Sequence, residues 1–285
     1  MPRSVSVDLF SVFAEEPGGG NPCPVVAAAD GLSTEDMLAV ARDHGHESAF
    51  LLTPSVPGAD VRMRYFVPKH EMQMCVHATV AGLTLLHEQK ALSAGPVEVE
   101  TPLGVLHTRI DADGTITVEQ FPPSIAGPFP EAVDDLAHAL GCDRRLIATR
   151  DTPRAVSVSR SKLLVEVDSV DTLHALSPDA EAVRRVCETH DVTGLYPFVV
   201  PDPAQPHAWA RQFPRDSGYP EDAATGLAAA ALSALLALRE PEDGAYNYEV
   251  HQGQAMGCPS RISTHATRST GLITRIAVSG HAHHG

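Results

Sequence analysis

Short runs of apolar residues dominate the chain, and they predict β-strands. The runs are rich in Val, Ile, Leu, Phe and Thr, and Gly, Pro, Asn or Asp bounds them, which is the pattern of strands separated by turns. They occupy residues 5–13, 49–52, 62–67, 97–110, 115–121, 155–167, 196–201 and 272–280. The chain is therefore expected to be rich in β-structure.

Four segments carry helical signals instead. "LSTEDMLAVARD", from Leu32, and "LSPDAEAVRRVCE", from Leu176, each begin with a Ser suited to cap a helix and continue with acidic residues in the first turn. The second copy also has Pro178 where a first helical residue is expected. "HATVAGLTLL", from His77, and "AATGLAAAALSALL", from Ala223, are apolar enough for buried helices.

These helical segments form an internal repeat. Leu32 and Leu176 are 144 residues apart, and His77 and Ala223 are 146 apart. Between them, "RYFVP" at Arg64 is matched by "RQFPR" at Arg211, 147 residues later. Three matches in the same order indicate two homologous halves.

The repeat predicts an α+β protein of two pseudo-symmetric lobes, with two helices in each half. The Pro- and Gly-rich segment "FPPSIAGPFPEA", near Phe121, is the expected linker. We expect residues 1–118 to form the first lobe and 119–285 the second, with the strand near 272–280 packing back on the first. An active site is expected in the cleft, where the helix starts converge and can bind an anion.

Composition and charge exclude several kinds of partner. The net charge of -15 argues against nucleic acid or an anionic membrane surface, and no apolar run approaches membrane-spanning length. The opening "MPRSVSVDLF" lacks the architecture of a signal peptide. Five widely spaced cysteines, an odd number, favour reduced thiols in the cytosol. The histidines show no zinc spacing, and the "HAHHG" tail would at most bind metal weakly, so no metal is expected.

Three residues could carry proton chemistry. Glu47, in "HGHESAFLL", stands beside an apolar strand, where desolvation should raise its pKa toward neutrality. His77 and Asp222 lie at or just before the starts of the second helix of each half. Taken singly, Glu47 is typical of a solvated loop residue, His77 of a structural histidine and Asp222 of a helix cap. The repeat favours a functional reading because it brings the helix starts together.

The chain also resembles a known family. "GGGNPCPVV", "LSTEDMLAVARDHGHESAFLL", "RYFVPKHEMQMCVHATVAG", "RQFPRDSGYPEDAATGLAAAAL", "QGQAMGCPSRI" and "IAVSGHA" resemble, in order and spacing, the PhzF-like phenazine-biosynthesis isomerases, which share the diaminopimelate-epimerase fold. The resemblance implies β-barrel lobes around central helices, no cofactor and a homodimer. It places the catalytic roles on Glu47, His77 and Asp222, and puts the backbone N–H of Gly226 near a substrate carboxylate.

The resemblance implies a proton-shuttling isomerase acting on a small acid. A dihydro-hydroxyanthranilate is one candidate, and a smaller unsaturated or cyclic amino or hydroxy acid of secondary metabolism, including antibiotic biosynthesis, is another. Val76, Ala78, Leu227 and Cys75 are the remaining candidates for substrate binding. Val76 replaces the Gly common in the family, Leu227 a small polar residue and Cys258 an Arg, which should make the pocket smaller or less polar.

Alternative functions depend on Cys75 and on these departures. In related racemases each half supplies a thiolate, but the second cysteine would fall near Ala223, so Cys75 is expected to be a buried, inert thiol. An epimerase that uses Cys75 remains an alternative. A non-catalytic binding protein is a second, and a metal hydrolase is the least favoured.

Overall fold

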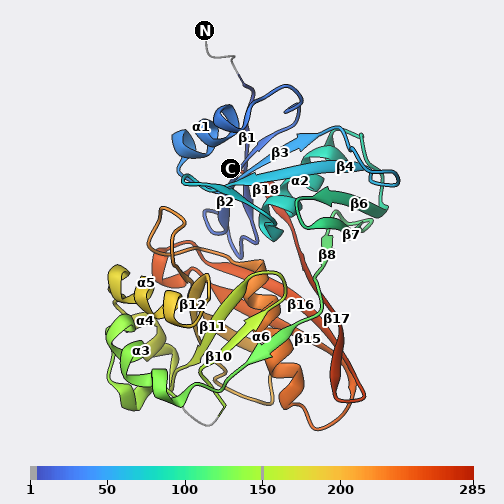
Figure 1. Ribbon diagram of the computed structural model, residues 1–285. Coiled ribbons are helices and arrows are strands. Elements are labelled where there is room, and N and C mark those ends of the chain that lie inside the picture. The colour runs from blue at the N-terminus through green and yellow to red at the C-terminus, as the bar shows by residue number, and fades with distance from the viewer. Residues whose placement is uncertain (1–4, 149–150) are drawn as a thin grey trace.

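Two lobes, each a curved sheet wrapped around one central helix, make up the chain in the computed structural model (Figure 1). Residues 5–148 and 151–285 are described, so the first four residues of the opening segment lie outside the described parts. The first lobe contains β1 (Asp8–Val12), β2 (Asn21–Val26), α1 (Thr34–His44), β3 (Ser48–Leu52), β4 (Val61–Phe66), β5 (Glu71–Met72), α2 (Val76–Glu88), β6 (Gly95–Thr101), β7 (Gly104–Ile110) and β8 (Ile116–Glu119).

The second lobe follows without a long linker. It contains β9 (Ser124–Ala126), α3 (Val133–Leu140), β10 (Arg154–Ser157), β11 (Ser161–Glu166), α4 (Val170–Ala175), α5 (Ala180–Thr189), β12 (Gly194–Val199), β13 (His207–Ala210), β14 (Phe213–Pro214), α6 (Gly226–Arg239), β15 (Gly244–Gln252), β16 (Ser260–Ser269), β17 (Leu272–Gly280) and β18 (Ala282–His284). The prediction of two helices in each half is therefore wrong for this lobe, which also contains α3 and α4. These two helices pack beside α5 in a second layer.

Strand pairing repeats from one lobe to the other, which confirms the duplication. In the first lobe β1–β2 is antiparallel, β2–β3 parallel, β3–β4 antiparallel, β4–β6 parallel, and β6–β7 and β7–β8 antiparallel. The series from β10 through β11, β12, β13, β15 and β16 to β17 follows the same order of parallel and antiparallel pairs. A fold of this kind places α2 and α6 in equivalent positions.

Equivalent side chains occupy equivalent places as well. Arg64 binds both oxygens of Glu71 at 2.7 Å and lies over the ring of Phe66. Arg211 binds both oxygens of Glu221, at 2.8 and 2.7 Å, and lies over the ring of Phe213. The match between "RYF" and "RQF" therefore reflects a shared structural device, a bidentate ion pair that holds the segment leading to the central helix.

Strand β17 joins the two lobes. Residues 277–280 pair with β8 of the first lobe, and residues 272–279 pair with β16 of the second. The chain then enters β18, which pairs with β1. The last strands thus return to the first lobe and nearly close its sheet around α2, as Figure 1 shows.

Local capping positions the segment that carries Glu47. The Ser33 hydroxyl accepts the N–H of Asp36 while the Asp36 carboxylate accepts the N–H of Ser33, so α1 begins with a capping box. It ends at Gly45, whose φ of 72° suits glycine, and Glu47 follows directly before β3.

In the second copy the predicted cap was wrong. The helix α5 begins at Ala180, and Asp179 caps it by accepting the N–H of Ala182 at 2.7 Å. Pro178 therefore precedes the cap, and the backbone N–H of Ser177 is used instead to bond Leu140 in α3. Within the described residues, no helix has both the length and the apolar character that crossing a membrane requires.

Candidate active site

A cavity lies between the lobes, at the starts of both central helices. Its lining includes Cys75, Val76 and His77 from α2 and Thr225 and Gly226 from α6. Cys75 and Thr225 are the N-cap residues, and neither side chain caps its helix within the described residues. The first N–H groups of two helices therefore lie at one cavity, which favours an anion there. The cavity measures about 30 Å³, room for roughly two water molecules.

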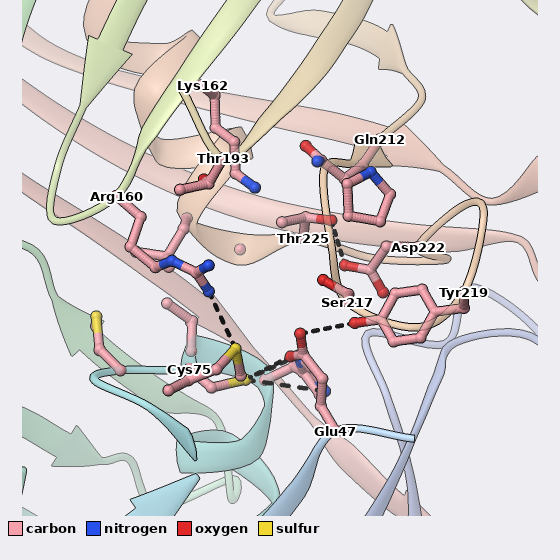
Figure 2. A pocket seen from close by; sticks show the side chains of 17 residues that line it. Glu47, Cys75, Arg160, Lys162, Thr193, Gln212, Ser217, Tyr219, Asp222 and Thr225 are labelled. Carbon is pink, nitrogen blue, oxygen red and sulfur yellow. Dashed lines mark hydrogen bonds and ion pairs between the residues drawn. The ribbon is translucent and has the colours of Figure 1, made fainter. Parts of the chain in front are cut away.

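Glu47 lies at one end of this cavity, held by donors from both lobes (Figure 2). The Tyr219 hydroxyl donates to its Oε1 at 2.7 Å, and the Cys75 thiol donates to its Oε2 at 2.9 Å. His77 Nδ1 lies 3.3 Å from the same Oε2. The Glu47 side chain is only 13 % exposed, so it is not a solvated loop residue.

The expected rise in the pKa of Glu47 was wrong. Burial does raise the pKa of this carboxyl, as the apolar strand suggested. His77 and the hydrogen bonds from Cys75 and Tyr219 lower it by more, so the net pKa lies below the ordinary value. Glu47 is therefore ionised at neutral pH and can accept a proton.

Asp222 has the opposite balance. Its Oδ1 accepts a hydrogen bond from Asn21 at 2.7 Å, and its Oδ2 accepts one from the Thr225 hydroxyl at 2.5 Å. Burial, reinforced by the negative charge of Glu47, raises the pKa of Asp222 to about 6. Asp222 is not the cap of α6, because it lies three residues before the N-cap Thr225. Two carboxyls whose pKa values are shifted in opposite directions are typical of an acid–base site.

Cys75 is buried, and it also contacts the acid–base groups. Its sulfur lies 3.2 Å from Nδ1 of His77 and bonds Glu47. Burial and the charge of Glu47 raise the pKa of the thiol well above its ordinary value, so the sulfur is protonated and serves as a donor. In the second lobe Thr225 precedes the first residue of α6 as Cys75 precedes that of α2, and Ala223 lies two residues earlier, so neither position provides a second thiol. A threonine hydroxyl does not ionise, so the site lacks a thiolate pair.

A network of hydrogen bonds, which the sequence did not predict, holds the loop that carries Asp222. Asn21, at the start of β2, also donates to the carbonyl of Ala224 at 2.9 Å and so crosses between lobes. Gln252 donates to the carbonyl of Asp222 at 2.6 Å and to Thr225, and accepts from the hydroxyl of Tyr196. Asn21 lies in "GGGNPC" and Gln252 in "QGQAMG", so the motif resemblance included them without assigning them a role.

The opposite end of the cavity carries positive charge. Figure 2 shows Arg160 and Lys162 approaching it from the β10–β11 hairpin, with Gln212 nearby. Among residues 5–148 and 151–285, the Lys162 ammonium has no hydrogen-bonding or ion-pair partner, although the residue is only 6 % exposed. The guanidinium of Arg160 contacts Met72 sulfur at 3.0 Å, and both side-chain polar atoms of Gln212 lack partners. Burial and the charge of Arg160 lower the pKa of Lys162 to about 8.

The remaining predicted residues divide into two groups. Val76, Gly226 and Leu227 line the cavity, as expected for substrate-binding positions. Ala78 does not line the cavity, because it is completely buried in the core around α2. Cys258 does not narrow the cavity either, because it lies in the turn after β15 with its sulfur 3.8 Å from the carbonyl of Met256.

Val76 fills space against the start of α6. A Cβ atom added to Gly226 would lie 2.8 Å from Cβ and Cγ1 of Val76, closer than real contacts allow. Gly226→Ala should therefore lower the free energy of unfolding by about 1–3 kcal/mol through overpacking. Urea unfolding checks this, and Val76→Gly in the same chain, which removes both contacting atoms, should recover part of the loss. Equal additive losses in the double variant would show that the two residues do not compete for space.

Cys75→Ala distinguishes a donor from a thiol base. Loss of one hydrogen bond to a charged carboxylate should reduce kcat by roughly 10-fold to 100-fold, and Cys75→Ser should recover much of it. The rate of isomerisation, once a substrate is in hand, is the measurement. Insensitivity of the wild-type enzyme to thiol alkylating reagents would agree, whereas complete loss of turnover in Cys75→Ser would assign proton transfer to the sulfur.

Comparison with known proteins identifies the family. The model of the PhzC-PhzF family, described as phenazine biosynthesis-like protein, matches residues 10–284. The chain belongs to this family, and it is an isomerase of the same two-lobed α+β fold.

Characterised and uncharacterised relatives agree with this assignment. The uncharacterised isomerase YddE of Escherichia coli K12 is 30% identical, over 99% of this chain and 95% of that protein. The trans-2,3-dihydro-3-hydroxyanthranilate isomerase of Pseudomonas aeruginosa is 32% identical, over 98% of this chain and 96% of its own length. The crystal structure of a PhzF-family protein of Bacillus anthracis has a TM-score of 0.87 at 26% identity, covering 98% and 96% of the two chains.

Proposed function

We propose that this isomerase moves a proton between two carbons of a small unsaturated or cyclic acid that carries an amino or hydroxyl group. The observation that supports this most directly is Glu47, an ionised and nearly buried carboxylate in a cavity shared with Asp222. A carboxylate of this kind can remove a proton from one carbon and return it to another on the same face of the substrate. One base is then sufficient.

Hydrogen-bond donors are available to stabilise the negative charge that develops on the substrate. When a proton leaves carbon, negative charge spreads over the conjugated system, and the free N–H groups at the starts of α2 and α6 can stabilise it. His77 and Asp222 can bond an amine or hydroxyl of the substrate, because both lie beside Glu47 in the cavity lining. The Glu47 carboxylate keeps its orientation through Tyr219 and Cys75.

The acid group of the substrate has a cationic partner. Lys162 is buried and unpaired within the described residues, and a buried ammonium group is costly until an anion joins it. Arg160 offers a planar guanidinium near the same place. The carboxylate therefore lies toward the second lobe in this proposal, with the reacting carbons toward Glu47.

The cavity favours a compact substrate. Val76 and Leu227 present apolar side chains where the family more often has Gly and a small polar residue, and the space is already small. The substrate of the Pseudomonas aeruginosa relative, trans-2,3-dihydro-3-hydroxyanthranilate, is the first compound to test. A role in secondary metabolism, a homodimer and an intracellular location stay predictions.

Proton transfer can be observed directly. The enzyme is incubated in D₂O with trans-2,3-dihydro-3-hydroxyanthranilate and with smaller unsaturated amino and hydroxy acids, and proton NMR follows each carbon. We expect isomerisation of at least one acid, with deuterium at the carbon that receives the proton. Absence of both isomerisation and exchange across the panel would contradict the proposed function.

A further inference from the structure

A second cluster of ligand-type side chains lies on the second lobe, on the neighbouring parallel strands β13 and β15. His207 pairs with Glu249 across the two strands, and His251 follows Glu249 by two residues on the same face. His207 Nδ1 lies 3.4 Å from Nε2 of His251 and 3.7 Å from Oε2 of Glu249. One ligand atom from each of the three residues can therefore face a common point.

These separations suit a tetrahedral metal ion. Nitrogen and oxygen ligands about 2.1 Å from Zn²⁺ in tetrahedral geometry lie roughly 3.4 Å from one another. The two separations given above, 3.4 and 3.7 Å, are close to that value, and all three ligand atoms lie within 4.8 Å of one another. Two imidazoles and one carboxylate leave one position for water.

Glu15 provides the outer contact that metal-binding histidines usually have. Its carboxylate lies 3.3 Å from Nδ1 of His251, the ring nitrogen opposite to the one that faces His207. A proton on Nδ1 can thus be donated to Glu15, which leaves Nε2 with a free electron pair for the metal. Glu15 belongs to the loop after β1, so the contact also joins the first lobe to the second.

The surroundings leave room for an ion. His207 and Glu249 are each 36 % exposed, so solvent can reach the site and supply a ligand. Arg261 is the competing cation, with its guanidinium 3.7 Å from Oε2 of Glu249. Its side chain is half exposed and can turn into solvent when a metal takes that oxygen.

We propose that His207, Glu249 and His251 bind a divalent transition metal ion, with Zn²⁺ the best match to two imidazoles and a carboxylate. The site is separate from the catalytic cavity, since none of its ligands is among the residues that line that cavity. Its expected role is structural: the metal would join β13 and β15 and, through His251 and Glu15, the loop after β1. Binding should therefore stabilise the folded protein without being needed for isomerisation.

The single tryptophan of the chain reports on this site. Trp209 stacks on His251 with ring centroids 4.6 Å apart. Co²⁺, a quenching ion of similar ligand preference, is titrated into the full-length protein while tryptophan fluorescence is followed, and Zn²⁺ is then added as a competitor. We expect saturable quenching by Co²⁺, reversal by Zn²⁺, and a higher Tm with Zn²⁺.

Matched variants separate this site from other metal-binding groups. His207→Gln should weaken Co²⁺ binding at least 10-fold, and Glu15→Gln should weaken it by roughly 10-fold to 100-fold. His283→Gln, in the exposed tail, and Cys75→Ala, in the other cluster of potential ligands, should leave the titration unchanged. Isomerase activity of His207→Gln should equal that of the wild type. Absence of saturable quenching, or equal quenching in wild type and His207→Gln, would overturn the proposal.

Discussion

Glu47→Gln is expected to lower turnover by roughly 10²- to 10⁴-fold, the contribution of a positioned general base. The amide has nearly the same shape, and its oxygen can still accept the hydrogen bond from Tyr219, while its NH₂ group replaces the oxygen that accepted from Cys75. It cannot take a proton from carbon. Deuterium incorporation from D₂O should disappear in parallel with turnover, while the Kd of a substrate acid should change little.

Tyr219→Phe is the matched control. It removes one donor to Glu47 and leaves the carboxylate in place, so kcat should fall by roughly 10- to 100-fold. Because that bond lowers the pKa of Glu47, its loss should also move the acidic limb of the pH–rate profile to higher pH. If Glu47→Gln retained deuterium exchange at the wild-type rate, another group would be the base.

Asp222→Asn should reduce activity and increase stability at the same time. The folded protein raises the pKa of this carboxyl from 3.8 to about 6, so holding it ionised at neutral pH costs folding free energy. Two pKa units correspond to about 3 kcal/mol. An amide avoids this cost, because its oxygen can accept from Asn21 while its nitrogen donates to the Thr225 hydroxyl.

The gain should depend on pH in a defined direction. The folded-state pKa exceeds the unfolded-state value, so Asp222 is most favourable when protonated, below about pH 4, and that advantage is lost as pH rises through 6. Urea unfolding should therefore show Asp222→Asn more stable than wild type by up to about 3 kcal/mol at pH 7.5 and nearly equal at pH 4. The exposed Asp135→Asn should differ little at either pH. A variant less stable at pH 7.5 would show that Asp222 is favourably ionised in the native state.

The sequence was sufficient for the architecture because duplication leaves matched signals. Capping residues near Leu32 and Leu176, the "RYF" and "RQF" strands and two apolar helices recur at similar spacing, and the observed strand pairing repeats with them. Cap positions were less certain, since Ser177 and Asp179 are both good caps. Asp179 is the cap because the backbone N–H of Ser177 bonds Leu140 in α3, a contact that the sequence alone does not show.

The cavity was predictable only in outline. Glu47, His77, Gly226 and Leu227 were found by motif and do line it. Tyr219, which lies 172 residues from Glu47, could not be found, because no local pattern shows a hydroxyl reaching across lobes. The predicted direction of the Glu47 pKa shift was wrong for the same reason. The apolar neighbours of Glu47 are visible in sequence, whereas the donors that outweigh them come from other segments.

The strand β17, which the two lobes share, limits how the lobes can move relative to each other. Because β17 bonds to β8 along one edge and β16 along the other, the lobes cannot separate by sliding apart without breaking backbone pairing. Because the cavity has room for only about two water molecules, we expect the lobes to swing about this strand when a ring-sized acid enters and leaves. Such hinge motions take microseconds to milliseconds and often limit turnover. We therefore expect kcat to fall as solvent viscosity rises, because the lobes must open once in each catalytic cycle.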